Sequence, residues 1–207
     1  MSTITARQPE TSPATRIDHT ELEVVLLLAS DPLAAPLLKD LEREYDARYG
    51  VEVFGEPAIT EINRYPVEAF AEPNGAFLVL LHHGEPISGG AFMRYDERTA
   101  EFKRIWTHAQ FRGQGLAKVV LRELEARARA LGYERVYLTT GPRQPEAVAL
   151  YLGYGYTALY DPELPPEEIG AHPFEKDLRT TAPSHLSTLA AAHANSLAIA
   201  IASGASS

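Results

Sequence analysis

Apolar positions near the start of the chain change from a continuous run to a helical spacing. Residues 22–29 are almost all apolar, which is typical of a buried strand. Ser30, Asp31 and Pro32 then supply a capping residue and an early proline, which favour the start of a helix. The following apolar side chains recur at helical spacing, and Gly50 is suited to end the helix. The residues of this stripe are Leu33, Leu37, Leu38, Leu41 and Tyr45.

Three apolar segments separated by short polar turns follow the mixed stretch 51–75, in which residues 66–71 favour a short helix. Turns this short favour an antiparallel meander. Residues 116–131 return to helical spacing, and residues 145–152 predict a second, short helix after the meander. The predicted strands are 22–29, 76–82, 87–95, 100–107, 135–140, 154–160 and 173–178. The pattern therefore predicts an α/β (α+β) fold, with a mixed, mostly antiparallel sheet of about seven strands flanked by helices.

The two ends of the chain differ from this patterned region. Residues 1–20 are rich in Thr, Ser, Pro and charge, so we expect a flexible arm. Residues 179–207 are rich in Ala and Ser and predict a tail with at most a weak helix. Between them, 21–178 is long enough for a single domain. The apolar runs 24–29 and 189–202 are too short to cross a bilayer, and no secretory signal is visible, so we expect no membrane segment.

The amino-acid composition excludes several kinds of site and partner. The 207 residues include no cysteine, which excludes disulfides, thiolate zinc sites and a cysteine nucleophile. A cysteine-free chain fits a cytoplasmic protein. The formal net charge of −9 disfavours nucleic acid and anionic membranes as partners, and it is compatible with a cationic substrate.

A glycine-rich turn joins the predicted strand 100–107 to the predicted helix 116–131. Residues 110–117 read Gln-Phe-Arg-Gly-Gln-Gly-Leu-Ala. Glycines at the N-terminus of a helix expose backbone N–H groups that bind phosphate. No Gly-Lys-Ser/Thr ending follows Gly115, so this is no P-loop, and Lys118 stands where a dinucleotide fingerprint needs its third glycine. A bare Gly-x-Gly is also compatible with a purely structural turn.

The surroundings of this turn resemble the GNAT N-acetyltransferase superfamily. Arg112, Gly115 and Ala117 fill that family's acyl-CoA signature, Arg/Gln-x-x-Gly-x-Gly/Ala. Segment 103–108 is similar to the family's fourth strand, and 145–156 is similar to its last helix and following strand. The resemblance extends over about 21–178; Gly153 departs from it, where many members have a helix former.

The resemblance implies a sheet whose fourth and fifth strands splay apart and a cosubstrate, acetyl-CoA, whose pantetheine arm pairs with the fourth strand and whose pyrophosphate lies on the turn. No metal is implied. The cofactor-binding residues that it implies are Trp106, Thr107, His108, Arg112, Gly113, Gln114, Gly115, Leu116, Ala117 and Lys118.

Two residues are candidates for catalysis. Tyr151 matches the family tyrosine that faces the sulfur, and a phenol can donate a proton to a departing thiolate; the alternative is a packing role beside Tyr154 and Tyr156. Glu101 is similar to a glutamate used as base in histone-acetylating relatives; the alternative is an ion pair with Lys103 or Arg104.

The histidines give weaker evidence of a functional role than Tyr151 and Glu101. His82 and His83 flank a predicted hairpin and are expected to be solvated, and His172 precedes the last strand. No His/Asp/Glu cluster has a convincing metal-ligand spacing. Segments 51–75 and 160–172, which contain Tyr65, Glu68, Glu72 and 163–168, are expected to select the acceptor.

The predicted function is direct transfer of an acetyl group from acetyl-CoA to an amine of a small molecule, an amino acid or a protein. One alternative is a non-catalytic acyl-CoA-binding regulatory module of the same fold, and another is a nucleotide-phosphate binder of a different fold. Dimers are common among related enzymes, so the resemblance is compatible with a homodimer.

Overall fold

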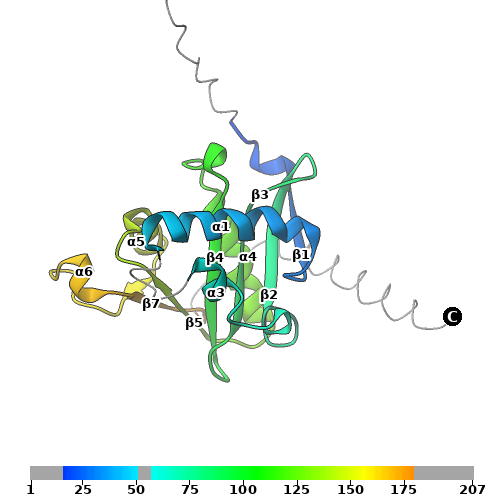
Figure 1. Cartoon of the computed structure of the whole chain (residues 1–207). Helices are drawn as coiled ribbons and strands as arrows, with labels where there is room; N and C mark the ends of the chain where they lie inside the picture. Colours follow the sequence, from blue (N-terminus) through cyan, green and yellow to red (C-terminus); the bar gives the residue numbers. More distant parts are fainter. Residues whose placement is uncertain (1–15, 51–56, 180–207) are drawn as a thin grey trace, which may run out of the picture.

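A seven-stranded sheet forms the centre of the molecule in the computed structural model, which describes residues 16–50 and 57–179 (Figure 1). The strands are β1 (Leu22–Leu27), β2 (Ala76–His82), β3 (Glu85–Arg94), β4 (Thr99–Thr107), β5 (Arg135–Thr140), β6 (Thr157–Ala158) and β7 (His172–Asp177). The helices are α1 (Ala35–Arg48), α3 (Ala58–Ile62), α4 (Leu116–Ala130), α5 (Pro145–Gly153) and α6 (Pro166–Ile169). Short 3-10 turns are η1 (His19–Glu21), η2 (Pro32–Ala34), η3 (Val67–Phe70) and η4 (Ala109–Phe111).

The strand order is β1-β2-β3-β4-β5-β7-β6, and every neighbouring pair is antiparallel except β4 and β5. The predicted class and the mostly antiparallel meander are therefore confirmed. The predicted strand 154–160 is too long, because only Thr157 and Ala158 pair with β7. The N–H of Tyr154 and the N–H of Tyr156 both bond to the Tyr151 carbonyl instead, so this stretch closes the C-terminus of α5.

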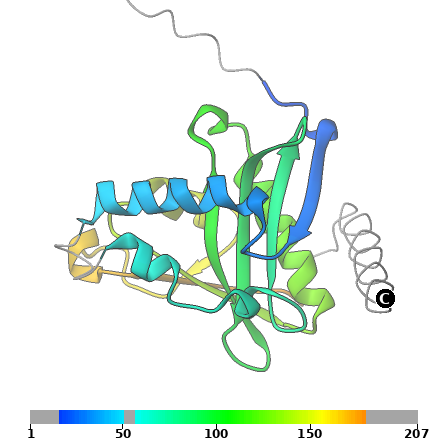
Figure 2. The ribbon, with the colours of Figure 1, turned by 45° about the vertical axis from the view of Figure 1, so that its right-hand side comes forward.

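Helices cover both faces of the sheet and bury two separate apolar clusters (Figures 1 and 2). Helix α1 crosses one face, where Leu37 and Leu41 pack beside Trp106. Helix α4 covers the opposite face, as its predicted apolar stripe requires. Leu116, Val120, Leu124 and Ala128 of that stripe are all buried, and Leu131 is half-buried.

The two central strands separate part of the way along. Residues 99–102 of β4 pair with residues 135–138 of β5, and the ladder ends there although both strands continue. A bulge opposite Gly90 accompanies the separation, with Arg104 at a φ of 61°, a left-handed conformation that is rare outside glycine. The far half of β4 is thus left with an edge that β5 does not cover.

The N-terminal segment is tied to the body of the protein from residue 16 onward. Ile17 is 5% exposed within the cluster under α4, and its N–H donates to Gln114 Oε1 at 2.8 Å. The domain boundary expected at residue 21 stays a prediction, as does the arm, of which residues 1–15 lie outside the described part. The tail beyond 179 also lies outside it. Within residues 16–50 and 57–179, no helix is long and apolar enough to cross a membrane.

Candidate active site

The turn after β4 has the backbone geometry that its glycines suggested. Gly113 and Gly115 have φ values of 77° and 80°, which side-chain-bearing residues adopt at a cost. Gly115 is the N-cap of α4, so the N–H groups of Leu116 and Ala117 have no carbonyl to meet within the helix. These amides and the positive end of the helix dipole form an electropositive cradle suited to phosphate.

A cavity of about 540 Å³ runs from this turn to the end of β4 and the inner side of α5. It lies where β5 no longer covers β4. Nine of the predicted residues line it: Trp106, Thr107, Arg112, Gly113, Gly115, Leu116, Ala117, Lys118 and Tyr151. The structure thus brings the glycine turn, the open strand edge and the tyrosine into one cavity, although they lie up to 45 residues apart in the sequence.

Three predicted residues do not line this cavity. His108 caps η4, and its ring packs 5.6 Å from the ring of Phe111, centroid to centroid. The Gln114 side chain accepts the N–H of Ile17 and lies in a neighbouring surface hollow beside Arg16 and His19. Glu101 lies outside the cavity because it is farther back on β4, in the part still paired with β5.

The Arg112 side chain is held by two hydrogen bonds. Its guanidinium donates to the Thr107 carbonyl at 3.1 Å and to Glu44 Oε2 at 2.8 Å. Glu44 lies on α1 and lines the cavity, yet the sequence reading did not single it out. A charged residue three positions after Leu41, on the stripe of α1 that faces the sheet, was the signal that marked it.

Tyr151 is a buried residue of the cavity lining. It is 6% exposed, and its ring packs against those of Tyr156 and Phe174 at centroid distances of 5.6 and 5.5 Å. Burial, with a smaller contribution from Tyr45, raises the pKa of the Tyr151 phenol above its ordinary value of 10.0. The hydroxyl is therefore a hydrogen-bond donor throughout the neutral range.

A second cavity of about 180 Å³ lies on the α1 and α3 side of the separated strands. Gln144 lines both cavities, and its Oε1 accepts from Thr140 Oγ1 at 2.9 Å and from the Gly141 N–H at 3.0 Å. The other lining residues of the smaller cavity are Tyr45, Tyr49, Glu61, Ile62, Tyr65, Phe102, Lys103, Arg104, Thr139, Thr140, Gly141 and Ala171. The two cavities therefore adjoin at the Gln144 side chain. The sequence does not indicate a role for Gln144, because this residue belongs to no recognisable motif.

The smaller cavity contains both signs of charge and several phenols. Burial raises the pKa of Tyr45 to about 12, and Glu61 contributes in the same direction. Burial lowers the pKa of the Arg104 guanidinium, which donates to the Ile62 carbonyl and lies 4.2 Å from the centre of the Phe70 ring. Lys103 lies 2.9 Å from Glu101, so the ion pair that was the alternative for Glu101 is present.

Comparisons with known proteins agree with this geometry. The Acetyltransferase (GNAT) family matches residues 36–156, more than half of the chain. The uncharacterized N-acetyltransferase YjgM of Escherichia coli (strain K12) is 28% identical over 138 residues, which cover 63% of this chain and 78% of that protein.

Solved structures show the same fold. An acetyltransferase from Streptococcus agalactiae superposes with a TM-score of 0.59 at 20% identity, over 76% of this chain and 98% of that one. The PaiA N-acetyltransferase from Thermoplasma acidophilum, solved in complex with coenzyme A, gives a TM-score of 0.57 at 17% identity, over 75% and 98%. The chain belongs to the GNAT acetyltransferase family, and this membership supports acyltransferase activity.

Proposed function

We propose that the protein transfers an acetyl group directly from acetyl-CoA to an amine. The observation that carries the proposal is the single cavity that joins a phosphate-binding turn, an uncovered strand edge and a buried tyrosine. A ligand whose pyrophosphate is joined to a reactive thioester by a long arm matches that order of features. The coenzyme A bound by the Thermoplasma relative supports the same ligand for this chain.

In this arrangement the protein binds coenzyme A mainly through its backbone. The N–H groups at the start of α4 receive the pyrophosphate, and Lys118 adds an exposed positive charge at the rim. Trp106 and Thr107 present the strand edge to the amide-rich pantetheine arm, as a β-strand would pair with them. Backbone recognition explains why the motif demands glycines but allows variable side chains.

The chemical step then needs an amine, a base and an acid. The amine nitrogen attacks the thioester carbonyl carbon, the C–S bond breaks, and the thiolate of coenzyme A takes a proton. The raised pKa of Tyr151 keeps its phenol protonated, so the hydroxyl is in place as a donor to the departing thiolate. The proton lost by the amine goes to a base, for which Glu101 remains the candidate, acting through water because it lines neither cavity.

The acceptor enters from the smaller cavity in this proposal, because that cavity meets the larger one at Gln144. Its volume of about 180 Å³ admits a small amine or the amine-bearing end of a larger molecule. Glu61 and the phenols suit an ammonium group, while Lys103 and Arg104 suit a carboxylate. Small-molecule amines, amino acids and protein amines are therefore the classes to screen.

A substitution in the glycine turn tests the coenzyme site. Gly115→Trp should remove the thermal stabilisation that acetyl-CoA gives, because the indole would fill the phosphate cradle. Gly132→Trp is the matched control: Gly132 follows the other end of α4, has a φ of 91° and is exposed, so it carries the same backbone strain without facing the cavity. An unchanged acetyl-CoA shift in Gly115→Trp contradicts the site. Stabilisation by ATP or NAD but not by acetyl-CoA would point to a nucleotide binder.

A further inference from the structure

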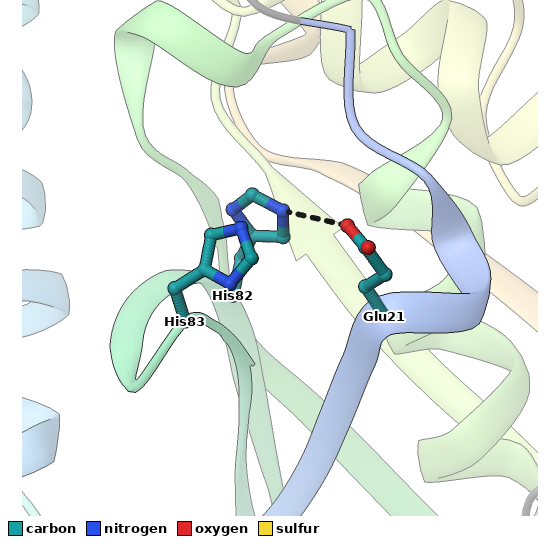
Figure 3. Close-up of side chains that lie close together, drawn as sticks. All are labelled: Glu21, His82 and His83. Carbon is teal, nitrogen blue, oxygen red and sulfur yellow. Dashed lines mark ion pairs between the residues drawn. The ribbon is translucent and has the colours of Figure 1, made fainter.

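A cluster of two histidines and a glutamate lies outside both cavities, at the end of the sheet where β2 turns into β3 (Figure 3). His82 ends β2, His83 is in the turn, and Glu21 ends η1 just before β1. One ligand atom from each lies within 4.8 Å of the others, and His82 Nε2 is 3.6 Å from Glu21 Oε2. We propose that this cluster binds a divalent zinc-class cation through His82, His83 and Glu21.

The turn geometry is the first argument. β2 and β3 are joined by two residues, His83 and Gly84, with φ values of 52° and 81°. Two positive φ values are what a type I′ hairpin requires, and Asn-Gly is the preferred sequence there. A histidine at the first position has no conformational advantage over asparagine. The conformation does bring the two imidazole rings together, with centroids 4.0 Å apart, whereas successive side chains of a regular strand point to opposite faces.

The ligand types are the second argument. Two imidazoles and one carboxylate form a donor set that zinc uses with water in the remaining position. Magnesium and calcium prefer sites made of oxygen, so the two nitrogens select against them. Zinc bonds of about 2.0–2.1 Å place tetrahedral ligands roughly 3.3 Å apart. Glu21 and His83 are exposed and His82 is half-buried, so rotation of these side chains closes the present distances without disturbing the core.

A simple ion pair does not account for the cluster. The contact between His82 and Glu21 is an ion pair only when the imidazole is protonated. It does not involve His83. A bound cation gives all three side chains a role.

The position of the site suggests what binding would do. Glu21 belongs to the N-terminal segment that also contacts the phosphate turn, since His19 Nε2 lies 2.8 Å from the Gln114 carbonyl oxygen. The cation would therefore link the N-terminal segment, through Glu21, to the β2–β3 hairpin. Metal binding would then stabilise the folded state by mass action.

Isothermal titration of the EDTA-treated full chain with ZnCl₂ tests the proposal. Wild type should bind one zinc ion in the micromolar range or tighter and should not bind MgCl₂. His83→Asn should weaken zinc binding at least about tenfold while keeping the melting temperature in EDTA unchanged or higher, because asparagine suits the turn. His82→Ala and Glu21→Gln should also weaken it at least about tenfold.

Glu85→Gln provides the control. Glu85 is exposed and pairs with His82 across the hairpin, but it is not a member of the cluster. This variant removes the same charge as Glu21→Gln at a position next to the cluster and should keep wild-type affinity. The absence of zinc binding by wild type, or equal affinity in wild type and His83→Asn, would overturn the proposal; so would an equal loss in Glu85→Gln and Glu21→Gln.

Discussion

At the scale of single residues, Tyr151 shows how burial and chemistry combine. Its ring packs against those of Tyr156 and Phe174. The same burial raises the phenol pKa, because a phenolate would lose its hydration. Packing was the alternative to catalysis in the sequence reading, and the structure shows that a packed tyrosine also lines the cavity.

Tyr151→Phe tests the proton-donor role. We expect kcat to fall by about 10²-fold or more, with the KM for acetyl-CoA changed by less than about twofold. Since the folded-state pKa is raised above 10.0, the phenol does not lose its proton as pH rises through the neutral range. The ratio of wild-type to variant kcat should therefore be constant from about pH 6 to about pH 9.

Tyr133→Phe is the control for loss of a buried tyrosine hydroxyl. Tyr133 donates to the Asn74 carbonyl at 2.8 Å and does not line the cavity. This variant should turn over like wild type. Equal kcat in wild type and Tyr151→Phe would remove the tyrosine from the mechanism.

Glu101→Gln tests the base at the same scale. We expect kcat to fall by about 10²-fold and the rise of activity with increasing pH to flatten, because the group that takes the amine proton is gone. Glu61→Gln is the matched carboxylate control, since Glu61 lines the smaller cavity. If Glu61→Gln loses the rising limb and Glu101→Gln keeps it, the assignment of Glu101 is wrong and its ion pair with Lys103 is structural.

At the scale of elements, a buried ion pair ties α4 to β7 and to the turn after α5. Glu125 is 1% exposed and accepts from Lys176 Nζ at 2.8 Å and from the Tyr156 hydroxyl at 3.0 Å. Lys176 also donates to the Tyr154 carbonyl at 3.0 Å. This network holds the segment that closes α5, the helix that carries Tyr151.

Glu125→Leu should lower the free energy of unfolding by about 3–5 kcal/mol, because it leaves the Lys176 ammonium buried without its partner. Urea denaturation measures the loss. Adding Lys176→Met should restore a large part of it, since the unpaired charge is then removed. Glu134→Gln, which breaks an exposed pair with Arg98, should change stability little. Additive losses in the double variant would contradict the network.

Periodicity was sufficient for most elements but not for their ends. The apolar stripe of α4 follows from burial on one face of the helix, and the nearly continuous buried runs of β2 and β3 follow from burial on both faces of the sheet. The strand predicted over 154–160 was too long because aromatic residues favour strands in general. In the structure Tyr156 follows a turn and packs in the core. The bulge at Arg104 was not predicted, since its positive φ carries no signal in an arginine.

At the scale of the whole molecule, the separation of β4 and β5 creates the site. Both cavities lie beside the separated strands, and Gln144 lines both of them. The glycine turn and Tyr151 could be singled out from the sequence, because each lies in a segment that resembles the GNAT family. Glu44 carries only the signal of a charge on the apolar stripe of α1, whereas Gln144 and the lining of the smaller cavity could not be predicted, because distant segments are brought together there by tertiary packing.

Amine-dependent release of thiol from acetyl-CoA is the direct measure of the proposed acetyl transfer. The chain has no cysteine, so every thiol detected comes from coenzyme A or an added reagent. With a panel of small amines, amino acids and peptides, we predict that at least one acceptor releases thiol and gains an acetyl group in equal amounts. Binding of acetyl-CoA without thiol release for any acceptor would contradict acetyl transfer and favour a non-catalytic acyl-CoA-binding module.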